Sequence, residues 1–126
     1  MSTAPEIWHN PRCSKSRAAT IHLDGIGAEY TVRRYLDDPP TPDELRAVLA
    51  RLGLEPWEIT RTGEAVAKEL GLKEWLRTDA ARERWIAALA AHPVLIERPI
   101  VLTPDGGAIV ARTQEALARL GSAAGR

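Results

Sequence analysis

The sequence predicts an α/β protein built on a mixed sheet of four short strands. Residues 6–35 read as strand, helix and strand, which makes a parallel pair of strands joined by a crossover helix. A helical block follows at about 41–92, and then a strand hairpin and a last helix. The one cysteine, Cys13, comes where the first strand passes into the first helix. This order is the layout of a thioredoxin-like fold, expected as a single domain over 1–126 with the helical block inserted.

Length, composition and charge indicate one globular, soluble domain. A chain of 126 residues can bury a core, and its 44% hydrophobic and 27% charged residues are ordinary proportions. A formal net charge of zero argues against a nucleic-acid partner. No apolar run approaches the ~20 residues of a membrane span, so no membrane partner is expected either. One cysteine cannot form an intrachain disulfide, which fits a reducing compartment, and we expect a cytoplasmic protein.

The first strand is predicted at 6–9, after a loose end at residues 1–5. The helix that follows is predicted at 14–26 and ends where glycine can adopt the left-handed cap conformation. One face of this helix carries Ala18, Ile21, His22 and Gly25. Residues 29–35 alternate and are rich in strand formers, which predicts the second strand.

The helical block begins with a clear start signal. Thr41 is a capping residue, Pro42 suits the first helical position, and Glu44 completes a capping box. The apolar stripe of this helix consists of Leu45, Val48, Leu49 and Leu52, before Gly53. Further helical segments are predicted at 56–59, at 64–70 and from Thr78 to Pro93.

The last part of the chain returns to strand signals. Short apolar strands are predicted at 100–102 and 108–110, joined by a turn at 103–107 that contains proline and glycine. Thr113 is the predicted cap of the last helix, and the chain is expected to fray from Gly121 onward.

Cys13 is the candidate nucleophile. Free backbone N–H groups and the helix dipole at a helix start stabilise an anion, so a thiol there loses its proton more readily, and the thiolate is the nucleophilic form. Arg12, Lys15 and Arg17 add positive charge nearby, and His9 would do so when protonated. The alternative is that Cys13 is a small buried hydrophobic residue.

The sequence predicts no metal site. The three histidines, at 9, 22 and 92, show no ligand spacing with the cysteine. Ser16 stands where a redox protein could carry a second cysteine, and we interpret it as a helix-start residue rather than a nucleophile.

Three segments carry a resemblance to a known family. They are His9–Arg17, which reads HNPRCSKSR, the pair Tyr35-Leu36 before two prolines, and His92–Val101, which reads HPVLIERPIV. Together they resemble the ArsC-type arsenate reductases that depend on glutathione and glutaredoxin, within the ArsC/Spx thioredoxin-like superfamily. The similarity extends over nearly the whole chain.

The resemblance implies a set of site residues. Cys13 would be the nucleophile, and Arg61, Arg98 and Arg112 would bind the oxyanion. The residues around the thiol would be His9, Asn10, Arg12, Ser14, Lys15, Ser16 and Arg17, with Asn10 shaping the loop. Thioredoxin-like folds also place a cis proline beside the active cysteine, and the matching residue is Pro99.

The implied activity is reduction of arsenate, or a similar oxyanion, to arsenite through a Cys13 adduct, as in arsenic resistance. Glutathione would be the co-substrate, glutaredoxin the partner, and no cofactor would be bound.

Two alternatives remain: a glutathione-linked thiol oxidoreductase with another substrate, and a non-enzymatic Spx-like protein that binds RNA polymerase. A redox-switching protein of that type uses Cys-x-x-Cys, and this chain has Ser16. A tyrosine-phosphatase-like enzyme uses Cys-x5-Arg, and this chain has Ala19 at that position.

Overall fold

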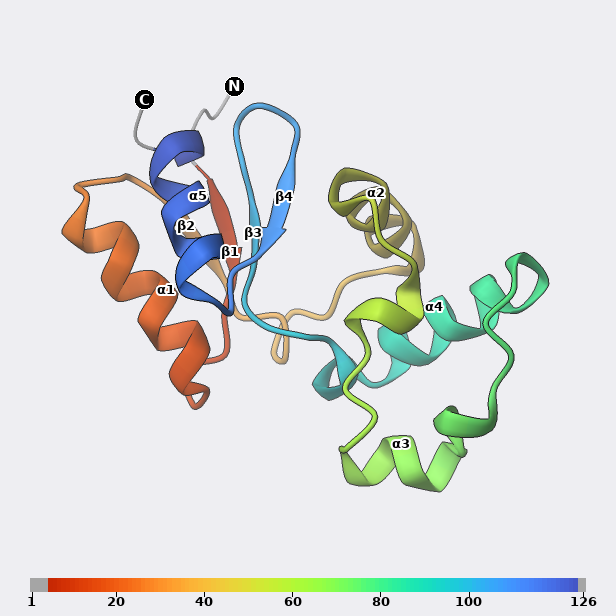
Figure 1. Cartoon of the computed structure of the whole chain (residues 1–126). Helices are drawn as coiled ribbons and strands as arrows, with labels where there is room; N and C mark the ends of the chain where they lie inside the picture. Colours follow the sequence, from red (N-terminus) through yellow and green to blue (C-terminus); the bar gives the residue numbers. More distant parts are fainter. Residues whose placement is uncertain (1–4, 125–126) are drawn as a thin grey trace. The chain divides into compact units, whose positions relative to one another are not determined.

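The computed structural model describes residues 5–124, with side chains up to residue 119. It consists of two compact units, one formed by the chain up to Asp38 and from Arg98 on, the other by Pro39–Glu97. The first unit contains β1 (Glu6–Trp8), α1 (Ser14–Gly25), β2 (Thr31–Arg33), β3 (Ile100–Leu102), β4 (Ala108–Val110) and α5 (Gln114–Ala124), shown in Figure 1. Except for Pro5, the loose end predicted at residues 1–5 lies outside the described residues.

The four strands form one mixed sheet in the order β2-β1-β3-β4. The β1 and β2 strands are parallel, and Ile7 lies opposite Val32. The β3 strand runs antiparallel to both β1 and β4, so Val101 lies opposite Ile7 on one side and Ile109 on the other. The predicted thioredoxin-like fold is therefore confirmed.

Helices α1 and α5 lie side by side and cover one face of this sheet (Figure 1). The core between them consists of Ile7, Val101, Ile109, Ala19, Leu23, Ala111, Ala116 and Leu117. Leu23 is fully buried there. Burial of a leucine side chain contributes about 2 kcal/mol to the free energy of unfolding, so this layer holds α1 and the loop before it in place.

The structure corrects three local predictions in this unit. The buried face of α1 is formed by Ser16, Ala19 and Leu23, whereas Ile21 is 69% exposed. The second strand covers only Thr31–Arg33, because a turn begins at Arg34, whose carbonyl accepts hydrogen bonds from two later N–H groups. The last helix continues past Gly121 to Ala124, and the rest of the predicted frayed tail lies outside the described residues.

The second unit is helical. Its elements are α2 (Pro42–Leu52), η1 (Pro56–Ile59), α3 (Ala65–Leu70), η2 (Leu72–Glu74), η3 (Asp79–Ala81), α4 (Arg82–Ala91) and η4 (Pro93–Leu95). The capping box predicted for α2 is present, since the Thr41 side chain accepts from the Glu44 N–H and the Glu44 side chain accepts from the Thr41 N–H. Gly53, with φ of 69°, ends the helix in the left-handed conformation that glycine adopts without steric cost.

The core of the helical unit is built around Trp85, which is fully buried in α4. Trp57 and Trp75 both meet its ring edge to face, with centroid distances of 6.1 and 5.4 Å. The Trp85 indole N–H donates to the Leu76 carbonyl at 2.8 Å, so the polar atom of this side chain is satisfied. Three of the four tryptophans of the chain are thus packing residues.

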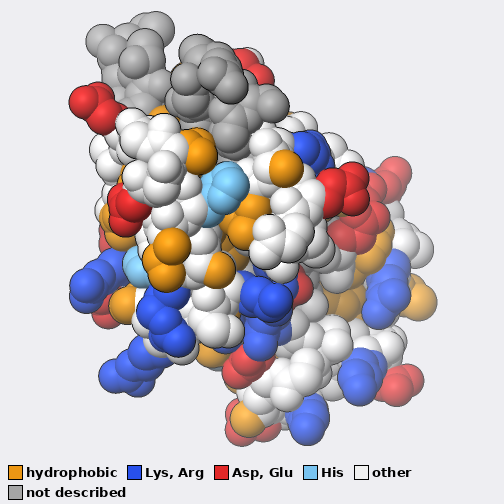
Figure 2. Space-filling view, turned by 60° about the vertical axis from the view of Figure 1, so that its left-hand side comes forward, with side chains coloured by type: hydrophobic (Ala, Val, Ile, Leu, Met, Phe, Trp, Pro, Cys, Tyr) orange, Lys and Arg blue, Asp and Glu red, His pale blue; other side chains and the backbone are white. Residues whose placement is uncertain are grey.

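The surface carries both signs of charge. Basic and acidic side chains are both spread over the face shown in Figure 2. The chain has 17 Lys and Arg residues in total and 17 Asp and Glu residues in total. None of the helices in the described part of the chain combines the length and apolar character needed to cross a membrane.

Candidate active site

The strand register brings two distant segments next to the cysteine loop. Trp8, at the end of β1, lies opposite Ile100, at the start of β3. Because these strands are antiparallel, the loop that leaves Trp8 runs beside the residues that precede Ile100, namely Arg98 and Pro99. Ile100 also pairs with Val110, so the residues after β4 reach the same end of the sheet.

The loop before Cys13 is held by hydrogen bonds of its own. The His9 N–H donates to the Arg33 carbonyl at 2.8 Å, which ties the loop to the end of β2. The Cys13 N–H donates to the Asn10 carbonyl at 3.0 Å, and the Asn10 side-chain oxygen accepts from the Arg12 N–H at 3.0 Å. Asn10 is buried, so its side chain shapes the loop from inside.

Cys13 is the capping residue of α1. The residue is half-buried, so it is not the fully buried hydrophobic residue of the alternative interpretation. Burial raises the pKa of the thiol. Four interactions together outweigh burial and lower the thiol pKa below its ordinary value. They are the Ser16 N–H, a hydrogen bond from the Arg98 side chain, the Lys15 N–H and the Arg98 charge. The site therefore favours the nucleophilic thiolate.

Arg98 supplies positive charge to the thiol from outside the start of α1. Arg12, Lys15 and Arg17 are all exposed. Lys15 acts through its backbone N–H, and the Arg17 side chain donates to the Pro11 carbonyl at 2.9 Å. The charged side chain that acts on the sulfur is Arg98.

His9 does not supply positive charge at neutral pH. Burial lowers its pKa below the usual 6.5, and the charges of Arg34 and Arg17 lower it further. At neutral pH the imidazole is therefore uncharged. Its Nδ1 atom lies 2.6 Å from the Ser16 hydroxyl oxygen. Ser14, the first residue of α1, is exposed.

Arg98 and Arg112 lie together beside the thiol loop. The Arg112 side chain donates to the Arg98 carbonyl at 2.6 Å, and the Ala111 N–H donates to the Pro99 carbonyl at 2.9 Å. The Arg98–Pro99 peptide bond is cis. The sheet unit thus brings together the predicted nucleophile and two of the three predicted oxyanion ligands.

Arg61, the third predicted ligand, belongs to the helical unit. Its guanidinium forms ion pairs with Glu64 at 3.2 Å and with Glu97 at 3.0 Å. The side chains of all three residues are about one-quarter exposed. An anion that binds Arg61 therefore competes with two carboxylates. The sequence analysis did not predict these two ion pairs.

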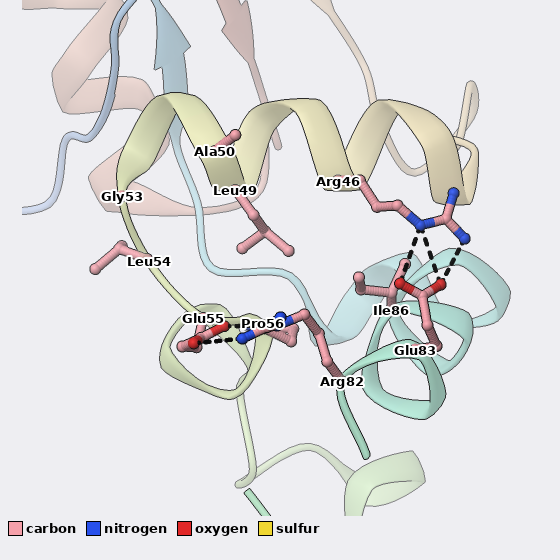
Figure 3. A pocket seen from close by; sticks show the side chains of 10 residues that line it. All are labelled: Arg46, Leu49, Ala50, Gly53, Leu54, Glu55, Pro56, Arg82, Glu83 and Ile86. Atoms are coloured by element: carbon pink, nitrogen blue, oxygen red, sulfur yellow. Dashed lines mark hydrogen bonds and ion pairs between the residues drawn. The ribbon is translucent and has the colours of Figure 1, made fainter. Parts of the chain in front are cut away.

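The helical unit also contains a pocket of about 480 Å³ between α2, η1 and α4 (Figure 3). Leu49, Ile86 and Pro56 line its apolar part, and two ion pairs lie along it, Arg82 with Glu55 at 2.7 Å and Arg46 with Glu83 at 2.5 Å. Its lining includes no thiol, hydroxyl or imidazole group. Cys13 therefore remains the candidate nucleophile.

Between residues 5 and 124, no three His, Cys, Asp or Glu side chains come close enough together to hold a metal ion.

Sequence reasoning missed the role of Ser16, which is fully buried and contacts both His9 and Asn10. No signal in the sequence indicated this role, because the helical spacing did not place Ser16 on the buried face.

Comparisons with known proteins agree with this geometry. The sequence profile of the ArsC family matches residues 8–120. A protein described as uncharacterised, from the glnII region of Streptomyces viridochromogenes, is 64% identical over 112 residues, which are 89% of this chain and 94% of that protein. The arsenate reductase of Neisseria meningitidis serogroup A is 42% identical over 111 residues, covering 87% and 92%. The solved arsenate reductase from Vibrio cholerae has a TM-score of 0.80 at 35% identity, covering 98% of this chain and 99% of that one. The chain belongs to the ArsC family.

Proposed function

We propose that this protein reduces arsenate to arsenite, with Cys13 as the nucleophile and with glutathione and glutaredoxin as reductants. The observation that carries the proposal is the Arg98 side chain beside a thiol whose pKa is lowered. Relatives named arsenate reductase support the choice of substrate. Reducing conditions and glutathione are found in the cytoplasm, which is the proposed location.

In the first step, the Cys13 thiolate attacks arsenic and forms a sulfur–arsenic bond, while one arsenate oxygen leaves as water after protonation. Arsenate is a tetrahedral anion, and the planar fork of an arginine donates two hydrogen bonds to such an anion without losing its charge. Arg98 lies at the sulfur, and Arg112 lies at the Arg98 carbonyl. In the proposal both bind arsenate oxygens, and the family resemblance assigns Arg61 to the same oxyanion.

In the second step, a glutathione thiolate attacks the Cys13 sulfur, and arsenic leaves with the electron pair of the sulfur–arsenic bond as arsenite. Arsenic gains two electrons, and two thiols become one mixed disulfide. The sequence has one cysteine, so this chain supplies no second thiol to resolve that disulfide. Glutaredoxin then attacks the glutathione sulfur and releases the Cys13 thiolate.

An assay of arsenite formation tests substrate and donor together. With arsenate, glutathione and glutaredoxin present, we expect steady turnover, and omission of either thiol donor should stop the reaction after at most one turnover per Cys13. Equal turnover with thioredoxin in place of both would contradict the proposed donors. Absence of arsenite with every donor, from a folded protein with a free thiol, would reject arsenate as the substrate.

A further inference from the structure

The Ser16 hydroxyl connects the segments on either side of Cys13. Ser16 belongs to the first turn of α1, and its side chain is fully buried. The Asn10 N–H donates to its oxygen at 3.0 Å, and His9 Nδ1 lies 2.6 Å from the same oxygen. The hydroxyl thus ties the loop before the cysteine to the helix after it. The Ser16 backbone N–H meanwhile stabilises the Cys13 sulfur.

The geometry also determines which nitrogen of His9 carries the proton. The Asn10 N–H uses one lone pair of the Ser16 oxygen, and the hydroxyl proton needs an acceptor because the group is buried. Among the described residues, the one acceptor at hydrogen-bond distance from this oxygen is His9 Nδ1. Ser16 therefore donates to Nδ1, which must be unprotonated, and the imidazole is neutral with its proton on Nε2.

The charges around His9 favour the same state. Arg34 and Arg17 both act on the imidazole, and burial adds to their effect, so its pKa is lowered. Arg98 is the charged side chain that hydrogen-bonds to the Cys13 sulfur. A protonated His9 would add a third cation close to Arg34 and Arg17, and it would lose its acceptor atom for the Ser16 hydroxyl.

We propose that Ser16 is a positioning residue for Cys13, whose hydroxyl keeps His9 in the neutral Nε2–H tautomer and holds the loop at His9 and Asn10 against the first turn of α1. In this arrangement His9 is a hydrogen-bond donor at Nε2 and is neither a base nor a cation. The Ser16 and Lys15 N–H groups then remain directed at the sulfur. The expected effect of Ser16 on turnover rests on the proposed function. The expected tautomer of His9 and the expected effect on the Cys13 pKa do not depend on it.

The first test uses the unaltered protein. Nitrogen-15 NMR of the imidazole groups, assigned with a His9→Gln variant, reports the charge and the tautomer of His9. We expect a neutral ring at pH 7 with the proton on Nε2. A charged ring at pH 7, or a proton on Nδ1, would overturn the proposal whether or not the protein reduces arsenate.

The second test removes the hydroxyl. In Ser16→Ala we expect a mixture of His9 tautomers, a raised Cys13 pKa in thiolate absorbance titrations, and a kcat about tenfold lower with little change in KM, as loss of one hydrogen bond predicts. Thr20→Val is the matched control, because the Thr20 hydroxyl lies one turn further along α1 and bonds only to the Arg17 carbonyl. It should leave all three quantities unchanged.

The two variants separate a positioning role from a purely structural one. A folded Ser16→Ala protein with an unchanged His9 tautomer and Cys13 pKa would refute the proposal. If Ser16→Ala does not fold, NMR of the unaltered protein still decides between the two tautomers. If the tautomer and the thiol pKa respond as expected but arsenate is not reduced, the proposed function fails and the positioning role of Ser16 stands.

Discussion

Replacement of Cys13 by serine is expected to lower arsenite formation by at least about a thousandfold, because removal of a covalent nucleophile has effects of this size or larger. A serine hydroxyl is not ionised at neutral pH, and it forms neither the sulfur–arsenic bond nor the mixed disulfide. The measurement is arsenite formation with glutathione and glutaredoxin at saturating arsenate, compared with the unaltered protein.

The same variant carries its own control for folding. Cys13 occupies the capping position of α1, and serine is among the preferred residues there. We therefore expect the free energy of unfolding to stay the same or to rise by about 0.5–1 kcal/mol. A stably folded Cys13→Ser protein that retains turnover would remove Cys13 from the mechanism.

Replacement of Arg98 by alanine is expected to cost about 10- to 100-fold in kcat/KM, since a hydrogen bond to a charged group contributes roughly 1.5–3 kcal/mol. Two losses combine. The oxyanion loses a guanidinium, and the Cys13 pKa rises because the Arg98 hydrogen bond and charge both lower it in the intact site. Less thiolate is then present at a given pH, so the defect should be largest at low pH and should shrink as the pH passes the raised pKa.

Two comparison variants make this prediction specific. Arg98→Lys should restore part of the activity, because lysine keeps the charge but lacks the planar fork of donors. Arg119→Ala removes an exposed arginine from α5 in the same unit and should leave activity and thiol pKa unchanged. Full activity in Arg98→Ala together with an unshifted Cys13 pKa would show that Arg98 does not act on the sulfur.

Local signals in the sequence predicted the elements that depend on local interactions. The capping box of α2 is formed within four consecutive residues, Thr41 to Glu44, so the residue types alone specify it. The apolar stripe of the same helix is also buried at Leu45, Val48 and Leu49. In α2, the helical spacing of the apolar residues therefore matches the face that is buried in the structure.

The face of α1 could not be predicted in the same way. Its buried side includes the polar residue Ser16, and its exposed side includes Ile21. Ser16 is buried because His9 and Asn10 supply hydrogen bonds from the loop before the helix, and a helical period does not reveal such partners. The length of β2 was overestimated because residues outside the ladder also favour strands. Tyr30 is one of them, and its hydroxyl instead donates to Asp24 at 2.8 Å.

The contacts between distant residues of the site depend on the strand register. The pairing of Trp8 with Ile100 explains why Arg98 acts on Cys13 from 85 positions away in the chain, a relation that spacing alone cannot give. Arg12, Lys15 and Arg17 are near Cys13 in sequence and are exposed, and nearness in sequence at a helix start does not by itself direct a long side chain toward the sulfur. The ion pairs of Arg61 with Glu64 and Glu97 also arise from tertiary contacts.

The most direct test of the account is the intact mass of the protein after a single turnover. The reduced protein is mixed with arsenate and glutathione without glutaredoxin, and the reaction is stopped before the thiol is regenerated. We predict one glutathione on Cys13 for each arsenite released, no adduct when arsenate is omitted, and loss of the adduct when glutaredoxin is added. Release of arsenite from a protein whose Cys13 never carries glutathione would contradict the account.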